Sequence, residues 1–236
     1  MTLQTTENVR SNVQAVLEAM ERAAGRAGRP ANSVQLVAVC KTITVDRIIE
    51  ALDAGVTDLG ENKVQETEAK ASQLQSRMKR LHLIGPLQKN KANKAAEIFD
   101  WIETLDNLEL AIRLDRACER LDKMLPVLVQ VNLGKEHTKS GIDAEHAMEF
   151  ICQLAGFKRL SVRGLMTVPP YLEDPEKVRP YFARLRMLAE QIGSQRPDNV
   201  SMTELSMGMS HDFPVAIEEG ATLVRVGTAI FGTRQT

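Results

Sequence analysis

The sequence predicts an α/β fold, a single closed (β/α)8 barrel of the TIM type over residues 1–236. Short apolar, β-rich runs alternate along the whole chain with amphipathic helical stretches, which is the pattern of a parallel sheet. Eight such runs occur, and no glycine-rich fingerprint follows the first one. This favours a closed barrel over an open doubly wound sheet, although a ninth strand is not excluded.

An extra helix is predicted ahead of the first strand, from Val9 to about residue 27. The strands are then expected at residues 34–41, 57–62, 80–85, 101–106, 126–133, 161–168, 203–209 and 223–232. Helices are expected between strands where apolar residues recur three and four positions apart, as in 45–55, 107–121, 144–157 and 176–193. Gly55 and Gly156 supply stop signals for two of these helices.

Composition limits the classes of partner. The chain has 236 residues and is 43% hydrophobic, enough to bury a full core. Its 30 basic and 31 acidic residues nearly cancel, so it has no global field to attract nucleic acid or an acidic membrane. The three cysteines are far apart, and neither a signal peptide nor a membrane-spanning run is present. These features predict a cytoplasmic protein with reduced thiols.

Polar residues end most of the predicted strands. In a barrel of this type the chemistry gathers at the C-terminal ends of the strands, because the interior is packed solid. For any single residue, a polar side chain exposed where its strand stops is the simpler explanation. Recurrence on strand after strand favours a site that includes Lys41, Glu61, Asn62, His82, Asn132, Thr167, Ser206, Ser210 and Arg225.

Phosphate-type donors gather near the C-terminus, between Ser210 and Gly232. A serine hydroxyl, the small-residue backbone at Gly227 and Thr228, and a helix N-terminus would offer donors and a favourable dipole to an anion. Together with Lys41, they predict a cradle for a phosphate-bearing cofactor.

Lys41 and Arg225 each allow two interpretations. Lys41 follows an apolar run, so its amine would sit at the mouth, where a neutral amine condenses with an aldehyde to form a Schiff base. It could equally be a solvated lysine that opens a loop. Arg225 shares a strand face with Gly227 and needs an acceptor, which could be a ligand or a carboxylate such as Glu204 in a structural ion pair.

Six stretches of the chain carry a family resemblance. They are AVCKTIT (38–44), GENKVQE (60–66), HLIGPLQKNK (82–91), VQVN with KSG (129–132, 139–141), GLMTV (164–168) and the long string at 205–234. In this order they resemble the family of pyridoxal 5′-phosphate (PLP) homeostasis proteins, which are fold-type III PLP-binding barrels similar to the N-terminal domain of alanine racemase. The resemblance covers nearly the whole chain after the opening helix.

The resemblance implies a role for each matched residue. Lys41 would be the Schiff-base lysine, Arg225 the donor that faces the pyridine nitrogen, and Ser210, Gly227 and Thr228 the phosphate site. Asn62, His82 and Met166 would lie near the cofactor ring, and Met209 beside Ser210 would touch the ligand. Two positions depart from the family pattern, Cys40 before the lysine and Lys63 after Asn62. An exposed Cys40 thiol would make the site sensitive to oxidation.

The implied function is to hold and deliver PLP without catalytic turnover. Arg225 stays charged, so it gives the ring nitrogen no proton and leaves the ring a weaker electron sink. The alternative is a small PLP-dependent amino-acid racemase or decarboxylase. A racemase needs a second acid–base group, a tyrosine from a separate domain in alanine racemases, and entry of Tyr171 into the mouth would revive this alternative. The expected partners are PLP and PLP-requiring apo-enzymes, and the expected state is a monomer.

Two other signals carry little weight. Lys89, Lys91 and Lys94 form a basic cluster that could contact nucleic acid, but a chain of net charge −1 without nearby aromatic residues fits a solvated helix start better. No nucleic-acid partner is therefore predicted. His211 beside Asp212 has no third ligand at metal spacing, so no metal is predicted.

Overall fold

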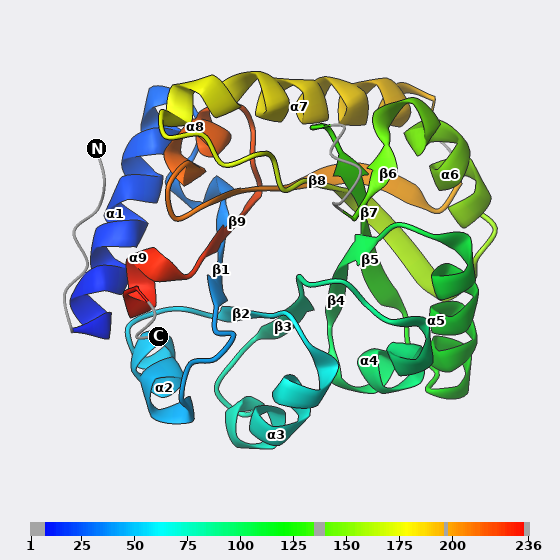
Figure 1. Cartoon of the computed structure of the whole chain (residues 1–236), viewed down its shortest axis with the longest axis horizontal. Coiled ribbons are helices and arrows are strands. Elements are labelled where there is room, and N and C mark those ends of the chain that lie inside the picture. The colour runs from blue at the N-terminus through cyan, green and yellow to red at the C-terminus, as the bar shows by residue number, and fades with distance from the viewer. Residues whose placement is uncertain (1–7, 135–139, 196–197, 234–236) are drawn as a thin grey trace.

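Parallel strands close into a barrel at the centre of the computed structural model, and helices surround it (Figure 1). The structure describes residues 8–134, 140–195 and 198–233. Within these ranges the barrel consists of eight strands: β1 (Gln35–Val39), β2 (Asp58–Glu61), β3 (Arg80–Leu83), β4 (Trp101–Leu105), β5 (Leu125–Asn132), β7 (Leu160–Met166), β8 (Val200–Met209) and β9 (Leu223–Val226). The predicted (β/α)8 barrel is confirmed.

Two pairings close the ring. β1 pairs with β9, with Val37 opposite Arg225, and β4 pairs with β5, with Ile102 opposite Val127. The short strand β6 (Ile142–Asp143) is a ninth strand, which pairs with the end of β5 after the pairing between β5 and β7 has stopped. It extends the sheet beside the mouth and takes no part in the closure.

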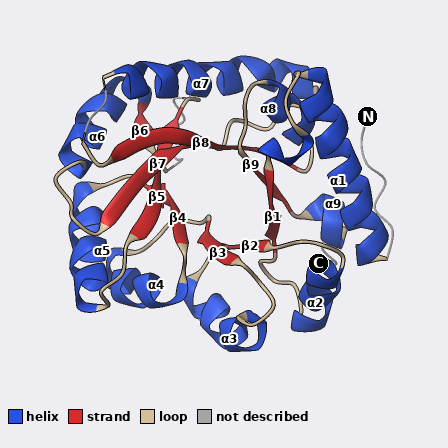
Figure 2. Ribbon diagram, turned by 180° about the vertical axis from the view of Figure 1, so that it is seen from behind, coloured by secondary structure: helices blue, strands red, loops and turns tan. Residues whose placement is uncertain are grey.

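Helices form the outer layer on all sides of the barrel (Figure 2). They are α1 (Val9–Arg26), α2 (Val45–Asp53), α3 (Val64–Leu74), α4 (Ala92–Ile98), α5 (Leu108–Arg120), α6 (Ala147–Leu154), α7 (Arg179–Ser194), α8 (Phe213–Glu218) and α9 (Thr228–Phe231). Short 3₁₀ turns are η1 (Ala31–Ser33), η2 (Lys89–Lys91), η3 (Ala144–His146) and η4 (Pro175–Val178). None of the described helices is both long and apolar enough to span a bilayer.

The predicted extra helix is α1, which packs against α2, α8 and α9. It begins at Asn8, whose side-chain oxygen accepts a hydrogen bond from the amide of Ser11 (3.1 Å). Its inner face is apolar apart from Asn12, which is buried and donates to the carbonyl of Ile230 (2.9 Å). The helix therefore joins the start of the described chain to the segment after the last strand.

The apolar core has two layers. A large layer lies between the barrel and the helices. A small cluster of Val37, Trp101, Leu128, Met166 and Leu223 lies separately from it. Because side chains alternate along a strand, these five point into the barrel, as do the polar residues of the site. On β4 and on β9, a polar residue of the site lies two positions after the apolar one. The inside of the barrel is thus only partly apolar.

The last strand is shorter than the sequence predicts. A strand was expected over 223–232, but β9 ends at Val226 and the helix α9 begins at Thr228. The apolar run TAIF continues as one helical turn, and three of its four residues (Ala229, Ile230 and Phe231) are buried. An apolar run of this length cannot distinguish a buried strand from a buried helix, so this part of the prediction was wrong.

Gly164 lies where strands β5, β7 and β8 change register. The pairing of β7 shifts beside Gly164 toward both neighbouring strands. A Cβ atom at this position would lie 1.8 Å from the carbonyl oxygen of Glu204. Only glycine allows the two backbones to approach this closely.

We expect Gly164→Ala to destabilise the protein by about 3 kcal/mol, because the methyl group must push β7 away from β8. Chemical denaturation measures the change. Gly25→Ala is the matched control, since a Cβ built on Gly25 in α1 would meet no atom within 4 Å beyond its chain neighbours and the helix's own backbone. That substitution should be neutral or stabilising by up to about 1 kcal/mol. Equal effects of the two substitutions would contradict the close approach.

Candidate functional site

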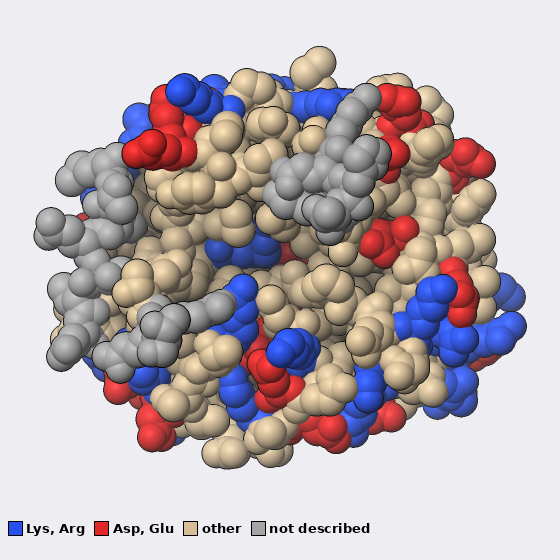
Figure 3. Space-filling view, in the orientation of Figure 1, with Lys and Arg blue, Asp and Glu red and all other residues tan. Residues whose placement is uncertain are grey.

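A cavity of about 460 Å³ opens at the C-terminal ends of the strands. Figure 3 shows the hollow at the centre of this face, with basic side chains visible inside it. Of the nine residues that the sequence analysis assigned to the cofactor, seven line this cavity: Lys41, Asn62, Met209, Ser210, Arg225, Gly227 and Thr228. The barrel therefore brings together residues that are up to 187 positions apart in the sequence, from Lys41 to Thr228.

Lys41 lies in a tight turn directly after β1. The amide of Ile43 donates to the carbonyl of Cys40 (3.1 Å), so Lys41 and Thr42 are the two central residues of the turn. Thr42 has a φ of 65°, a left-handed conformation that β-branched residues rarely adopt. Such strain persists only where the surroundings fix the backbone, and it is concentrated at functional sites. The Lys41 side chain itself is half-buried.

Arg225 brings a nearly buried positive charge to the cavity, since its exposed fraction is 4%. One guanidinium nitrogen donates to the hydroxyl of Ser206 (2.5 Å), and the other donates to the carbonyl of Thr167 (2.8 Å). Burial lowers the pKa of Arg225 from its ordinary value, and the carboxylates of Glu103 and Asp212 oppose that decrease. The guanidinium remains charged throughout the physiological range.

The ion pair between Arg225 and Glu204 that the sequence allowed is not formed. Glu204 accepts a hydrogen bond from the Thr222 hydroxyl (2.7 Å) instead. Their level along the barrel explains the difference: alternation puts Glu204 and Ser206 on the same face of β8, but Glu204 lies one level away from the residue that contacts Arg225. The carboxylate that faces Arg225 is Glu103 on β4, across the barrel at 4.0 Å.

Glu103 is fully buried and sits beneath the cavity. Its carboxylate accepts hydrogen bonds from Ser206 Oγ (2.5 Å) and from His82 Nδ1 (2.7 Å). Burial by itself would raise the pKa of Glu103, but the hydrogen bond from His82 and the charges of His82 and Arg225 hold it below its ordinary value. Glu103 therefore stays ionised as the counter-charge of Arg225.

His82 continues this polar chain toward the other end of the barrel. Its ring stacks on Trp101, with centroids 5.6 Å apart, and its Nε2 lies 3.8 Å from a carboxylate oxygen of Asp58. That oxygen accepts two hydrogen bonds from Arg80, at 2.7 and 3.0 Å. His82 was assigned to the cofactor ring by resemblance, but the structure places it below the cavity and not on its wall.

Ser210 forms the centre of a small group of donors. Its hydroxyl oxygen accepts from the amides of Gly227 and Ala229, both at 3.2 Å, and the Thr228 hydroxyl lies 3.4 Å away. A Cβ on Gly227 would lie 3.3 Å from Val39, so the backbone runs close to β1 here. The helix that follows is a single turn, so these individual amides and hydroxyls, not a helix dipole, suit a phosphate oxygen.

Asp212 fixes the loop that carries Met209 and Ser210. Its carboxylate accepts from the amide of Met209 (2.6 Å), and its exposed fraction is 5%. Burial raises the pKa of Asp212, while the Met209 amide and the charge of Arg225 oppose part of the increase. The loop between β8 and α8 is thus held by a local hydrogen bond close to Arg225.

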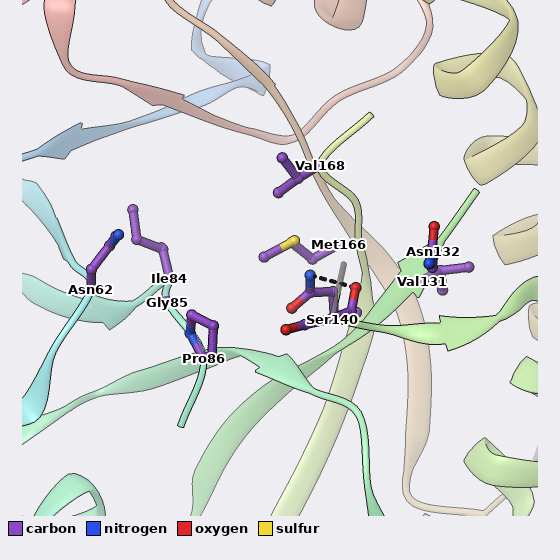
Figure 4. Close-up of a pocket in the computed structure, with 10 residues that line it drawn as sticks. Asn62, Ile84, Gly85, Pro86, Val131, Asn132, Ser140, Met166 and Val168 are labelled. Carbon is purple, nitrogen blue, oxygen red and sulfur yellow. Dashed lines mark hydrogen bonds between the residues drawn. The ribbon is translucent and has the colours of Figure 1, made fainter. Parts of the chain in front are cut away.

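A second, smaller cavity of about 210 Å³ adjoins the first (Figure 4). The two share Asn62, Ile84 and Val168 on their walls. Met166, the ninth assigned residue, lines this smaller cavity, and Gln130 donates to the carbonyl of Ser140 (3.1 Å) beside it. Asn62 therefore stands between the two cavities, and Met166 does not touch the larger one.

Tyr171 lines the larger cavity from the loop after β7. Its side chain is 73% exposed, and its ring is tilted against that of His211, with centroids 5.1 Å apart. His211 is held by hydrogen bonds to the carbonyls of Leu172 (3.2 Å) and Glu173 (2.9 Å). Tyr181 lies in α7 and packs against the outer core, away from the mouth.

Sequence reasoning missed Glu103 and the burial of Cys40. A charged residue in the middle of a buried strand was the available signal for Glu103, because such residues are rarely buried without a partner. Cys40 is 1% exposed, so the condition for an oxidation-sensitive site is not met. Alternation along β1 turns its side chain to the outer face of the barrel, opposite to Val37 and Lys41.

Two lysines of the predicted basic cluster, Lys89 and Lys94, have acidic partners. Lys89 pairs with Glu109, and Lys94 pairs with Glu68 (2.8 Å) and Glu97 (3.2 Å), as a solvated helix start would. Within the part of the chain that the structure describes, no three His, Cys, Asp or Glu side chains group closely enough to hold a metal ion.

Comparisons with known proteins agree on one family. The model of the family described as "Alanine racemase, N-terminal domain" matches residues 11–235. The pyridoxal phosphate homeostasis protein of Aquifex aeolicus (strain VF5) is 42% identical over 228 residues, 97% of this chain and 99% of that protein. The protein of the same name from Escherichia coli (strain K12) is 39% identical, over 96% and 97% of the two chains.

A solved structure extends the comparison to a ligand complex. PipY of Synechococcus elongatus PCC7942, solved with PLP bound, has a TM-score of 0.79 and is 40% identical, over 91% of this chain and 99% of that chain. Sequence and structure thus lead to the same group of proteins over nearly their full length. This chain belongs to the alanine racemase N-terminal domain family and, within it, to the pyridoxal phosphate homeostasis proteins.

Proposed function

We propose that this protein binds PLP through a Schiff base on Lys41 and serves PLP homeostasis by holding the cofactor and passing it to apo-enzymes. The observation that carries the proposal is a single cavity that unites an amine, a buried guanidinium and a cluster of phosphate-type donors. The names of the relatives and the PLP-bound structure of PipY support it.

PLP supplies an aldehyde that an amine can capture reversibly. The neutral Lys41 nitrogen would attack the aldehyde carbon, forming the carbon–nitrogen double bond while the carbonyl oxygen leaves as water with the two amine protons. The Lys41 turn fixes where that nitrogen starts. Ser210, Gly227 and Thr228 would hold the phosphate at the neighbouring strand end, because their hydroxyls and amides already converge there.

Arg225 favours storage over turnover. As a permanently charged donor it can hydrogen-bond to the ring nitrogen without transferring a proton to it. Glu103 and Ser206 hold the guanidinium in this state from the side opposite the cavity. The chain's own residues therefore bind and orient the cofactor but do little to stabilise negative charge on the substrate carbon.

Location and assembly belong to the same proposal. Cys40, Cys118 and Cys152 are all free thiols, which fits the reducing cytoplasm. We propose a monomer that meets its recipient enzymes through the open mouth of the barrel.

Lys41→Ala should abolish the near-visible absorption band that wild-type protein develops with PLP, because Lys41 is the lysine that lines the cavity among the residues that the structure describes. Borohydride reduction followed by peptide mass mapping should locate the cofactor on Lys41. Lys89→Ala, which removes a half-exposed lysine paired with Glu109, should leave both results unchanged. A band that survives in Lys41→Ala would overturn the assignment.

Ser210→Ala should weaken PLP binding about tenfold, since a phosphate loses one hydrogen-bonding hydroxyl. Equilibrium titration with PLP and with pyridoxal, which lacks the phosphate, separates this effect from a general loss of the fold. Pyridoxal binding should not change. Ser72→Ala on the exposed face of α3 is the control. Equal losses for both ligands would show that Ser210 does not act on the phosphate.

The holoprotein should not racemise or decarboxylate amino acids faster than free PLP does. Incubation with D- or L-amino acids followed by chiral analysis measures this directly. Tyr171→Phe serves as a check, because the tyrosine hydroxyl is the acid–base group that the racemase alternative needs. Turnover above free PLP that disappears in Tyr171→Phe would establish the alternative.

A further inference from the structure

A buried ion pair lies directly behind the Lys41 turn, on the outer face of the barrel. Lys70 of α3 donates from its ammonium to a carboxylate oxygen of Glu61 (3.1 Å) and to the carbonyl of Cys40 (3.2 Å). The exposed fractions of the Lys70 and Glu61 side chains are 18% and 2%. None of these contacts is with the cavity, so the proposed cofactor chemistry does not use them.

The Cys40 carbonyl is the point at which this pair meets the turn. The same oxygen accepts the amide of Ile43 (3.1 Å), which closes the turn around Lys41, and the ammonium of Lys70. The Cys40 amide donates to the Gly60 carbonyl (3.0 Å). Both polar groups of the Cys40 backbone are therefore engaged, one by β2 and the other by a charged side chain.

The Cys40 thiol adds a third link. It lies 3.3 Å from the carboxylate oxygen of Glu61 that also accepts from Lys70. Burial raises the pKa of this thiol well above its ordinary value, and the charge of Glu61 raises it further, so the thiol stays protonated and donates. Glu61, the residue before Asn62, thus connects the ends of β1 and β2 through two donors.

These contacts oppose relaxation of the strained turn. A threonine at a φ of 65° tends to relax to a more common backbone conformation, which would swing the preceding residue, Lys41. Charge-assisted hydrogen bonds are stronger than neutral ones, and the Lys70 ammonium supplies one to the carbonyl that anchors the turn. A buried ion pair is by itself weak evidence for stability, so a role in geometry is the better account.

We propose that Lys70 is a positioning residue that holds the Lys41 turn, and so the Lys41 amine, in the geometry that captures an aldehyde. The proposal rests on the proposed function, because it concerns the same lysine. Lys70 itself touches neither cofactor nor cavity and acts only through the Cys40 carbonyl.

The test compares Lys70→Met, which keeps the length of the stem but removes the charge and the donors, with Lys70→Arg, which keeps both. Absorption titration with PLP, at a temperature far below the unfolding transition of each variant, gives the equilibrium constant for Schiff-base formation. We expect a loss of about tenfold for Lys70→Met, equivalent to one charge-assisted hydrogen bond, and substantial rescue by Lys70→Arg. Lys94→Met, which removes a surface lysine of α4, should match wild type.

Lys70→Met leaves Glu61 as a buried carboxylate without its cation and so reduces stability. The double variant Lys70→Met/Glu61→Gln removes that charge and still lacks the ammonium donor to Cys40, so it should fold and keep the weakened equilibrium. Borohydride trapping followed by mass spectrometry provides a second readout of the fraction bonded to Lys41.

The outcomes separate the two proposals. Absence of the band in wild-type protein would overturn the proposed function, and the positioning role with it. A normal band in wild type together with an unchanged equilibrium constant in both Met variants would overturn the positioning role alone. A lower melting temperature with an unchanged equilibrium constant would show that Lys70 only joins α3 to the barrel.

Discussion

The charge of Arg225 is the constraint around which the inside of the barrel is arranged. A guanidinium with an exposed fraction of 4% needs a counter-charge, and Glu103 provides it from the opposite wall. Glu103 in turn accepts from Ser206 and His82, and His82 lies close to Asp58. Because each buried polar group requires the next, one arginine at the mouth accounts for a polar chain that crosses the barrel, where packed apolar layers are usual.

Closure of the barrel brings this series of polar residues together with Lys41 to form a site. β9 pairs with β1, so Arg225 lies opposite Val37, and the turn that follows β1 holds Lys41. β8 pairs with β9 on its other edge and ends at Met209, directly before Ser210. The amine, the guanidinium and the phosphate-type donors thus come from three adjacent strands, and a shift in the register of any one of them would separate the set.

The sequence predicts most of this arrangement. Strand and helix alternation gave the barrel, and the rule that chemistry gathers at strand ends gave Lys41, Ser210 and Arg225. Sequence patterns could not identify the partner of Arg225, since Glu103 and Glu204 are equally charged and only the barrel geometry decides which carboxylate lies next to the guanidinium. Periodicity also could not end the last strand at Val226, because the apolar run continues into α9.

β2 shows how the inner and outer requirements meet in a single strand. Its two carboxylates, Asp58 and Glu61, lie on opposite faces, one inside the barrel with Arg80 and the other outside with Lys70. Between them, a Cβ at Gly60 would lie 2.9 Å from the side chain of Val37. A glycine therefore leaves room for β1 at the point where β2 carries a carboxylate on each face. The inner pair belongs to the series of polar residues that balances the charge of Arg225, and the outer pair holds the carbonyl before Lys41. Opposite faces of one four-residue strand thereby support the two residues on which capture of a cofactor would depend.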